Sequence, residues 1–271
     1  MVCLLFLTKR PFIQIRNLVF IGSIILFTGS LAKAQEQVLD RPFRSGEELL
    51  YTIYYNWKFV WIPAGEVKFT VKEDVDTLVF EVTGKSFSSY DSFFKVRDYY
   101  CSKVSKQSLL PYNFWREIQE GNYFRFDSLN FDYQNKQVHE YFGKTKETAK
   151  EYHFDLPSLT HDMVSVIYHL RTYPIETFEE GEEIPVRIFF DKEFFELDIN
   201  FIGKETKKIR DLGRREVYHF QPELIEGYVF NEGDFMDIWI SDDGYRLPLL
   251  IESPIKYGKV KAILKEAKLN E

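Results

Sequence analysis

Apolar and polar residues alternate with a period of two along most of the chain beyond residue 43. In the clearest example, Val67, Phe69 and Val71 are separated by Lys68 and Thr70, which is typical of a β-strand with one buried and one solvated face. Turn-forming residues separate the alternating stretches from one another. The pattern predicts further strands at 49–55, 78–82, 96–104, 112–119, 123–131, 137–142, 184–190, 194–202, 215–221, 235–241, 247–253 and 258–264.

A segment in the middle of the chain has helical spacing instead. Its apolar residues recur three and four positions apart, which predicts an α-helix over 158–171 with one apolar face. Asp162 in the first turn and Arg171 in the last turn carry the charges that a helix dipole favours at its ends. We therefore assign both to structural helix-end roles, with a polar site at the sheet as the alternative. The residues expected to pack on the sheet are Met163, Val164, Ile167 and Leu170.

The two β-rich regions on either side of this helix resemble each other. Gly-Glu-Glu occurs at 46–48 and at 181–183, and Leu-Pro follows at 110–111 and at 247–248. This order is typical of a repeated unit, although such short strings also recur by chance. We predict an all-β, mainly antiparallel fold, a curved sheet or open barrel built from two β meanders joined by one central α-helix. The two meanders are expected at about 43–145 and 181–265.

The first 34 residues differ in composition from the rest of the chain. They contain four basic and no acidic residues, an apolar run over 18–31, and Ala-Lys-Ala at 32–34. This order of regions is typical of a secretory signal peptide. A transmembrane anchor is the alternative, but the run is shorter than the roughly 20 apolar residues that span a bilayer. We predict a signal peptide at 1–34, a single exported domain at 35–271 without a transmembrane segment, and a periplasmic, cell-surface or secreted location.

Charge and cysteine content narrow the partners of this domain. Without the first 34 residues the chain has 31 basic and 42 acidic residues, a net charge of −11. Nucleic acids and anionic lipid surfaces are disfavoured as partners, because both attract basic surfaces. Cys101 is then the one remaining cysteine, so no internal disulfide can form. Its alternating apolar surroundings predict a buried, unreactive thiol.

Motifs for catalysis or metal binding are missing from the sequence. No H-x-x-x-H, C-x-x-C, G-x-S-x-G or glycine-rich phosphate loop occurs. His161 and His169 are expected about 12 Å apart along the predicted helix, too far to share an ion. The acidic runs are interpreted as solvated turns and surface. We predict no catalytic residue, no metal site and no cofactor, with the carboxylate pair of a hydrolase as the alternative.

Aromatic residues are the feature most open to a functional role. They make up 17% of the chain, and several gather beside predicted turns. A doublet within a strand places one ring on each face of the sheet. Outward rings could bind lipid, glycan or an envelope protein, and close packing on a pleated sheet is the alternative. The candidates for a ligand or partner surface are Trp57, Trp61, Phe93, Phe94, Phe194 and Phe195.

Three segments, taken in order, carry a family resemblance. GEELLY at 46–51 is similar to the pattern G-E-x-L-x-Y, and the segment 162–171 to D-x-x-S followed by Y-x-L-R. The segment 239–260 is similar to W-x-S-x-D, then R-x-P, then G-x-V. Together they resemble an exported bacterial family, the domain of unknown function 3108. The resemblance implies a curved antiparallel β fold and a periplasmic or cell-surface location, and it implies no activity.

The combined interpretation is an exported cell-envelope β protein that is not an enzyme and that binds an apolar ligand or an envelope partner. Similar curved sheets occur in carriers that move lipids or lipoproteins across the periplasm, which is a likeness of fold alone. A structural or assembly protein of the envelope is the first alternative. A hydrolase of envelope polysaccharide or lipid is the second. The sequence identifies neither the ligand nor the oligomeric state.

Overall fold

The computed structural model describes residues 41–57, 60–225, 233–256 and 258–270. The predicted signal peptide at 1–34 lies outside the described residues, and of Trp57 only the backbone is described. Fifteen strands of the described chain form a single sheet. They are β1 (Glu48–Trp57), β2 (Val60–Glu73), β3 (Thr77–Ser86), β4 (Val96–Ser105), β5 (Pro111–Glu120), β6 (Tyr123–Asp132), β7 (Gln137–Gly143), β8 (Lys150–Asp155), β9 (Thr160–His161), β10 (Glu183–Phe190), β11 (Glu193–Ile209), β12 (Gly213–Pro222), β13 (Asp237–Ser241), β14 (Pro248–Ile255) and β15 (Gly258–Lys268).

The strands follow the order β8-β7-β6-β5-β4-β3-β2-β1-β15-β14-β13-β12-β11-β10-β9 across the sheet. Two antiparallel meanders, β1–β8 and β10–β15, are joined where β1 pairs with β15 and Tyr51 lies opposite Leu264. The short strand β9 pairs parallel with β10. Because β8 and β9 lie at opposite edges, the sheet does not close into a barrel. The predicted fold class, a mainly antiparallel sheet of two meanders, is confirmed.

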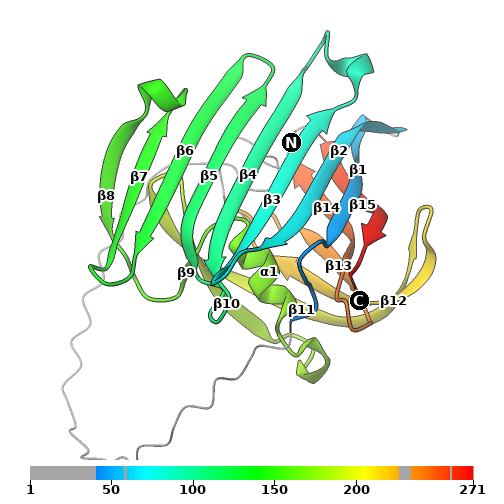
Figure 1. Ribbon diagram of the computed structural model, residues 1–271. Coiled ribbons are helices and arrows are strands. Elements are labelled where there is room, and N and C mark those ends of the chain that lie inside the picture. The colour runs from blue at the N-terminus through cyan, green and yellow to red at the C-terminus, as the bar shows by residue number, and fades with distance from the viewer. Residues whose placement is uncertain (1–40, 58–59, 226–232, 257, 271) are drawn as a thin grey trace, which may run out of the picture.

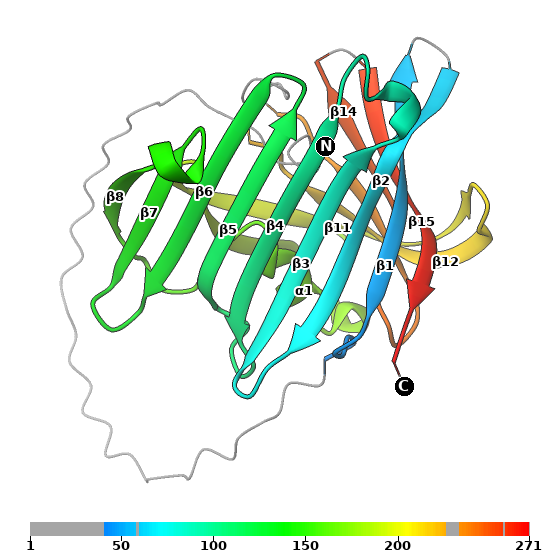
Figure 2. The same ribbon diagram turned by 45° about the horizontal axis from the view of Figure 1, so that its top comes forward.

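The sheet curls so that its two halves face each other across the interior. In Figures 1 and 2 the strands β3–β7 form one wall, and β10–β12 pass behind them with helix α1 (Ser165–Arg171) between. The β10–β11 hairpin reaches the far end of the first meander, where the ring centroid of Phe189 lies 5.1 Å from that of Phe154 on β8. The curl therefore encloses an interior although the sheet is open at its edges.

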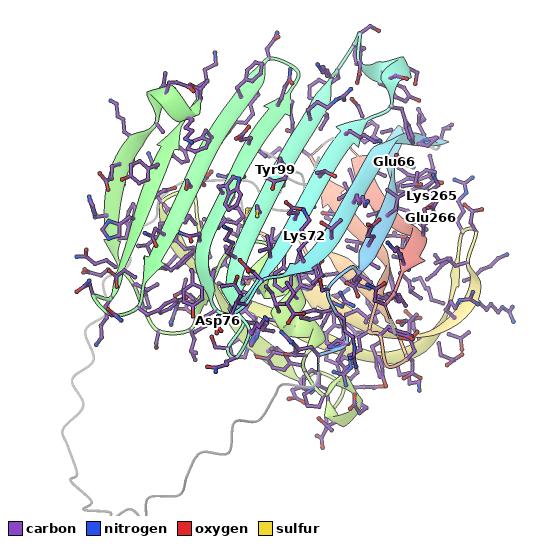
Figure 3. All side chains as sticks on the ribbon, in the orientation of Figure 1. Glu66, Lys72, Asp76, Tyr99, Lys265 and Glu266 are labelled. Atoms are coloured by element: carbon purple, nitrogen blue, oxygen red, sulfur yellow. The ribbon has the colours of Figure 1, made fainter. Side chains whose placement is uncertain are left out.

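The outer face of the sheet carries ion pairs between strands. Lys265 on β15 lies 3.1 Å from Glu66 on β2, and Lys72 on β2 lies 2.5 Å from Glu81 on β3. Figure 3 shows Lys265, Glu66 and Lys72 along this face. Exposed pairs of this kind contribute at most about 1 kcal/mol each. The alternation within the strands thus sorts most charged side chains to the solvent side and leaves most of the inner face to apolar ones.

Helix α1 begins at Ser165, seven residues later than the spacing of apolar residues predicts. The residues Thr160–His161 form β9 instead, beside β10. Leu159 is exposed and has a positive φ of 56°, which a helix interior does not permit. The predicted helix start was therefore wrong, because the first apolar residue of the pattern points to solvent. Three 3₁₀ helices complete the described elements, η2 (Ser88–Tyr90), η3 (Lys146–Thr148) and η4 (Ile175–Thr177).

The two Gly-Glu-Glu corners have the same local structure. Gly46 has a φ of 88° and Gly181 a φ of 86°, a conformation that favours glycine, and the amide of each donates a hydrogen bond to the second strand of its meander. The Leu-Pro steps also match, since the residues just before them, Leu109 and Arg246, both have positive φ. The corners precede β1 and β10, and the Leu-Pro steps lead into β5 and β14. The two meanders therefore share a plan over five strands.

Helix α1 lies between two clusters of buried apolar residues. Met163, Val164 and Tyr168 pack in the larger cluster with the inner face of the first meander. Ile167 and Leu170 pack against the smaller cluster, which α1 forms with β10–β13. The four residues predicted to pack on the sheet all do so, but they face different parts of the curled sheet and do not form one stripe. A single short helix can therefore contact both meanders.

Candidate functional site

An apolar cavity of about 110 Å³ lies between α1 and the strands β10–β13. Ile167 and Leu170 border it from the helix. In the β10–β11 pair, Val186 lies opposite Leu197, so the inward-facing branched residues of two strands form one wall. Among its described lining residues, Glu223 is the one charged side chain. The remaining wall includes Ile184, Ile188, Ile199, Phe220, Ile238 and Ile240.

The chemistry of this cavity suits binding better than catalysis. An apolar cavity of about 150 Å³ lined by Leu, Ile and Phe stays dry and binds benzene. The present cavity is of similar size and lining, so it suits an aromatic ring or the end of an acyl chain. A catalytic site needs a few converging polar side chains to orient the reacting group. Among the described lining residues, only Glu223 could do so.

The C-terminal end of α1 is held by a buried ion pair. Arg171 donates two hydrogen bonds to the Glu47 carboxylate, with Nη1–Oε1 and Nη2–Oε2 distances of 2.7 and 2.9 Å, and a third to the backbone carbonyl of Tyr245. Both charged side chains are only 2% exposed. This bidentate geometry is among the stronger polar contacts in proteins. It fixes the helix to the corner before β1 and to the turn before β14.

The N-terminal end of α1 is anchored through Asp162. Its Oδ1 accepts hydrogen bonds from the amides of Val164 and Ser165, at 2.8 and 2.9 Å, and its Oδ2 accepts one from the hydroxyl of Ser102 on β4, at 2.6 Å. Burial raises the pKa of this carboxyl to about 6, against the opposing effect of the three donors. Asp162 therefore caps the helix and ties it to the first meander.

The segments that carry the family resemblance meet around these anchors. Glu47, from the first segment, pairs with Arg171 from the second. The hydroxyl of Tyr51 donates to the carbonyl of Pro248 in the third segment, at 2.9 Å, and the Arg246 guanidinium donates to the carbonyl of Arg171, at 3.3 Å. An ion pair and two hydrogen bonds between three segments that are far apart in the sequence thus connect α1, β1 and β14.

Three of the predicted aromatic site residues lie away from the cavity. Trp61 on β2 lies beneath Lys261, whose Nζ is 4.3 Å from the ring centroid. Phe93 and Phe94 lie between η2 and β4, and Phe93 is 92% exposed. The side chain of Trp57 is outside the described part of the chain. Trp61 and the Phe93–Phe94 pair belong to separate elements, and their role in binding stays a prediction.

The other two predicted residues, Phe194 and Phe195, lie at the start of β11 and are half-buried. The ring centroid of Phe194 is 4.6 Å from that of Phe189 across the β10–β11 hairpin. Phe195 packs against both apolar clusters. The doublet thus takes part in the packing of the hairpin, and Phe195 packs against the apolar cluster that includes Val186 and Ile188 of the cavity wall, although neither ring lines the cavity.

A buried charged cluster on the inner face of the first meander was not predicted. Arg116 on β5 is fully buried, and its Nη2 lies 3.0 Å from Asp127 on β6 and in short contact with Asp191. Asp191 belongs to the β10–β11 turn, and Arg125 lies 3.4 Å from it. Glu140 on β7 is buried in the same place. The cluster binds the tip of the second meander to the interior of the first.

Glu140 is the third carboxyl of this cluster, beside Asp127 and Asp191, and it lies near Arg116 and Lys192. Burial raises the pKa of Asp127 and that of Glu140, the latter to about 9. A proton on Glu140 lets it donate a hydrogen bond to Asp127. Arg116, Asp127, Asp191 and Glu140 are all at most 3% exposed, so a substrate cannot reach the cluster. Its ion pairs connect the β10–β11 turn to β5 and β6.

Glu140→Gln is expected to stabilise the protein at pH 8 more than at pH 5. Folded Glu140 keeps its proton up to about pH 9, whereas the unfolded chain loses it above about pH 4.5. The folded state therefore binds more protons in this window, and the wild-type free energy of unfolding falls as pH rises. Glutamine mimics the protonated acid and removes this loss, which amounts to at most about 1.4 kcal/mol per pH unit.

Urea denaturation of both proteins at pH 5 and pH 8 measures this effect. Glu183→Gln, at an exposed position on β10, is the control and should leave the pH dependence unchanged. If Glu140→Gln lowers stability equally at both pH values, Glu140 is ionised in the folded protein and the assignment of its proton is wrong.

His161 and His169 lie closer together than the sequence predicts. Their ring centroids are stacked 4.4 Å apart, because His161 belongs to β9 and not to the helix; the expected separation of 12 Å was wrong. Burial lowers the pKa of His161 to about 3 and also lowers that of His169, so both imidazoles are neutral at pH 7.

Cys101 is buried, and burial raises the pKa of its thiol to about 12, which fits the predicted unreactive thiol.

Most of the chain matches a known protein family. A family model described as "Protein of unknown function (DUF3108)" matches residues 50–265, and the chain belongs to this family. This confirms the resemblance seen in the three segments. No curated protein matches the sequence. Within the described residues, no helix is long and apolar enough to cross a membrane.

Two solved structures are similar to this one at low sequence identity. A β-barrel-like protein of the domain of unknown function DUF1849, from Brucella abortus, has a TM-score of 0.56 at 6% identity, covering 84% of this chain and 98% of that one. A protein with a YmcC-like fold from Bacteroides fragilis has a TM-score of 0.33 at 10% identity, over 84% and 98% of the two chains. The first similarity shows that the curled, barrel-like sheet is shared, and it concerns the fold alone.

Proposed function

We propose that this protein is an exported, non-enzymatic component of the cell envelope that binds an apolar ligand between α1 and β10–β13. The cavity of about 110 Å³ is the observation that carries this proposal. Protein interiors are close-packed, and an empty cavity lowers stability in proportion to its volume. A guest that fills the space offsets this cost, which supports a binding role for the cavity.

Export is supported by the first 34 residues, whose basic, apolar and small-residue regions follow the order of a signal peptide. The absence of enzymatic activity is supported by where the unusual carboxyls lie. Asp127, Glu140 and Asp162 are all buried and occupied by contacts that hold elements together. General acid and base groups must reach the proton they transfer, and these positions offer no such access.

The size of the cavity limits what it contributes to affinity. About four methylene groups fit in such a space, and each contributes about 0.8 kcal/mol on burial. The resulting 3 kcal/mol or so corresponds to a dissociation constant of several millimolar. A tightly bound natural ligand therefore has to extend beyond the cavity. One end of an acyl chain inside, with the remainder along the sheet, meets this requirement.

Val186→Phe is expected to weaken the binding of fluorobenzene at least about 10-fold. Val186 is buried in the cavity wall, and a phenyl ring there occupies the space that the probe needs. Fluorine NMR titration measures the dissociation constant. Ile202→Phe, on an exposed position of β11, is the matched control and should bind like the wild type. Equal binding by a folded Val186→Phe protein would contradict the assignment of the cavity.

Native mass spectrometry of the protein from its own host distinguishes the proposed function from its alternatives. Co-purified acyl lipid supports ligand binding. A stoichiometric envelope protein without lipid supports a structural or assembly role. Hydrolysis of envelope polysaccharide or lipid by the purified protein, with neither ligand nor partner bound, overturns the non-enzymatic assignment.

A further inference from the structure

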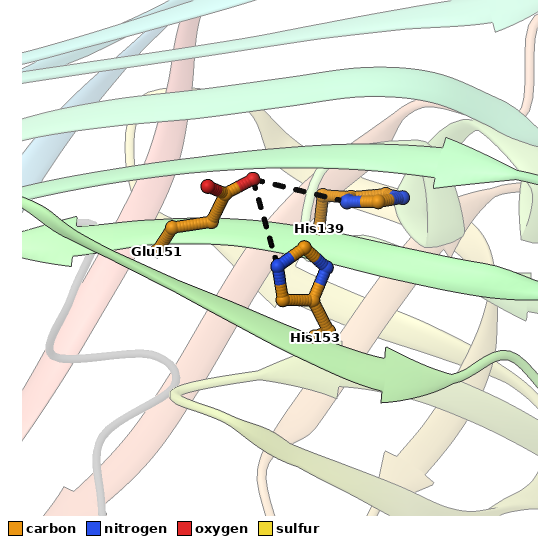
Figure 4. A group of neighbouring side chains, drawn as sticks. All are labelled: His139, Glu151 and His153. Carbon is orange, nitrogen blue, oxygen red and sulfur yellow. Dashed lines mark ion pairs between the residues drawn. The ribbon is translucent and has the colours of Figure 1, made fainter.

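A cluster of potential metal ligands lies on the surface of the first meander, at its β7–β8 edge. His139 on β7 lies directly opposite His153 on β8, and Tyr141 lies opposite Glu151 in the same antiparallel register. Residues two positions apart along a strand share a face of the sheet, so these four side chains project from one side. Figure 4 shows His139, Glu151 and His153 gathered there.

The ligand atoms of this cluster are close to coordination distance. Oε1 of Glu151 lies 3.7 Å from Nε2 of His153 and 3.9 Å from Nδ1 of His139, and the three residues offer ligand atoms that all lie within 4.8 Å of one another. Zinc bonds of about 2.0–2.1 Å in tetrahedral geometry place ligand atoms about 3.3 Å apart. Because the side chains are on the surface, small rotations are enough to close this difference.

We propose that His139, Glu151 and His153 bind a zinc ion at the edge of the sheet. Two imidazoles and one carboxylate form a ligand set that zinc accepts, and they leave one tetrahedral position for water or another donor. Magnesium and calcium prefer sites made of oxygen ligands, so the two histidines favour the transition metal. The ion takes this position without disturbing the core, since the ligands project to the surface.

Tyr141 adds a support for one of the ligands. Its hydroxyl donates a hydrogen bond of 2.9 Å to Oε1 of Glu151. Partners of this kind orient a metal ligand, and their loss commonly weakens metal binding by about 10–100-fold. The site is on the first meander and the apolar cavity is on the second, so the zinc proposal and the proposed function can be tested independently. The zinc proposal differs from the prediction of no metal site, which considered ligand spacing only along the sequence.

Isothermal titration of the full-length protein with zinc tests this proposal. We expect one ion per chain, and substitution with cobalt should give the intense visible absorption of a four-coordinate ion. His139→Ala and His153→Ala should each weaken zinc binding by more than about 100-fold, and Tyr141→Phe by about 10-fold. Lys150→Ala, next to Glu151 in the sequence, is the control and should leave binding unchanged.

The fold should survive these changes, because the side chains of His139 and His153 are 28% and 54% exposed. The melting temperature without metal checks this for each variant. Zinc binding by His153→Ala at wild-type affinity overturns the proposal. Wild-type protein that binds less than one equivalent of zinc, or that gives the weak spectrum of six-coordinate cobalt, overturns it as well.

Discussion

Arg116→Met is expected to lower the free energy of unfolding by about 3–5 kcal/mol, because it leaves the buried Asp127 without its paired cation and Asp191 with Arg125 alone. Arg116 lies 3.0 Å from Asp127 and in short contact with Asp191. Methionine keeps much of the hydrocarbon of the side chain but removes the guanidinium, which pairs with the aspartates and lies 4.4 Å from the ring centroid of Phe190, so the loss reports mainly on the guanidinium. Urea denaturation at neutral pH measures it.

Arg125→Met is the matched control for this substitution. Arg125 lies 3.4 Å from the same Asp191, but its side chain is 20% exposed. Partly solvated pairs contribute at most about 1 kcal/mol, so the control should lose far less stability than Arg116→Met. Equal losses in the two variants would show that the buried cluster does not hold the β10–β11 hairpin to the first meander.

Arg171→Met is expected to cost a similar 3–5 kcal/mol, because Glu47 then stays buried without a partner. The same substitution removes the hydrogen bond to the carbonyl of Tyr245 and so releases the end of α1 from two elements at once. Since Ile167 and Leu170 of this helix border the cavity, fluorobenzene binding should weaken in the same variant. Urea denaturation and fluorine NMR give the two results.

The double variant Glu47→Leu with Arg171→Met separates charge from packing. Apolar replacement of both partners of a buried pair is often close to neutral, so the double variant should be more stable than Arg171→Met alone. Arg187→Met, on β10, serves as the surface control, because Arg187 pairs at 2.5 Å with an exposed Glu196 and its loss should cost at most about 1 kcal/mol. A double variant that loses more than the single one would contradict a pair-specific role.

Most strands could be predicted from the sequence, because a sheet with one solvated and one buried face imposes a period of two on its strands. The strand predicted at 112–119 is β5, Pro111–Glu120. The edge strand β8 was missed, since it has only Tyr152 and Phe154 as apolar residues and both are half-buried. A strand at an edge covers little of the core, and so it carries a weak apolar signal.

The interior sites depend on the curl of the sheet, which local patterns do not contain. Arg116 occupies an apolar position of its strand, between Phe114 and Ile118, and a charged residue there is a signal of a buried polar network. Its partner Asp191 is 75 residues away in the sequence, and only the curled sheet brings the two together. The apolar cavity likewise results from incomplete filling between α1 and the strands β10–β13, which depends on side-chain volumes in three dimensions.

X-ray diffraction from crystals under xenon pressure tests the binding role of the cavity most directly, because xenon enters dry apolar cavities. Xenon should occupy the space bounded by Ile167, Leu170 and Val186, and Val186→Phe should remove that peak while Ile202→Phe keeps it. Ordered water in this space, or xenon peaks confined to other parts of the molecule, would contradict the cavity as the ligand site.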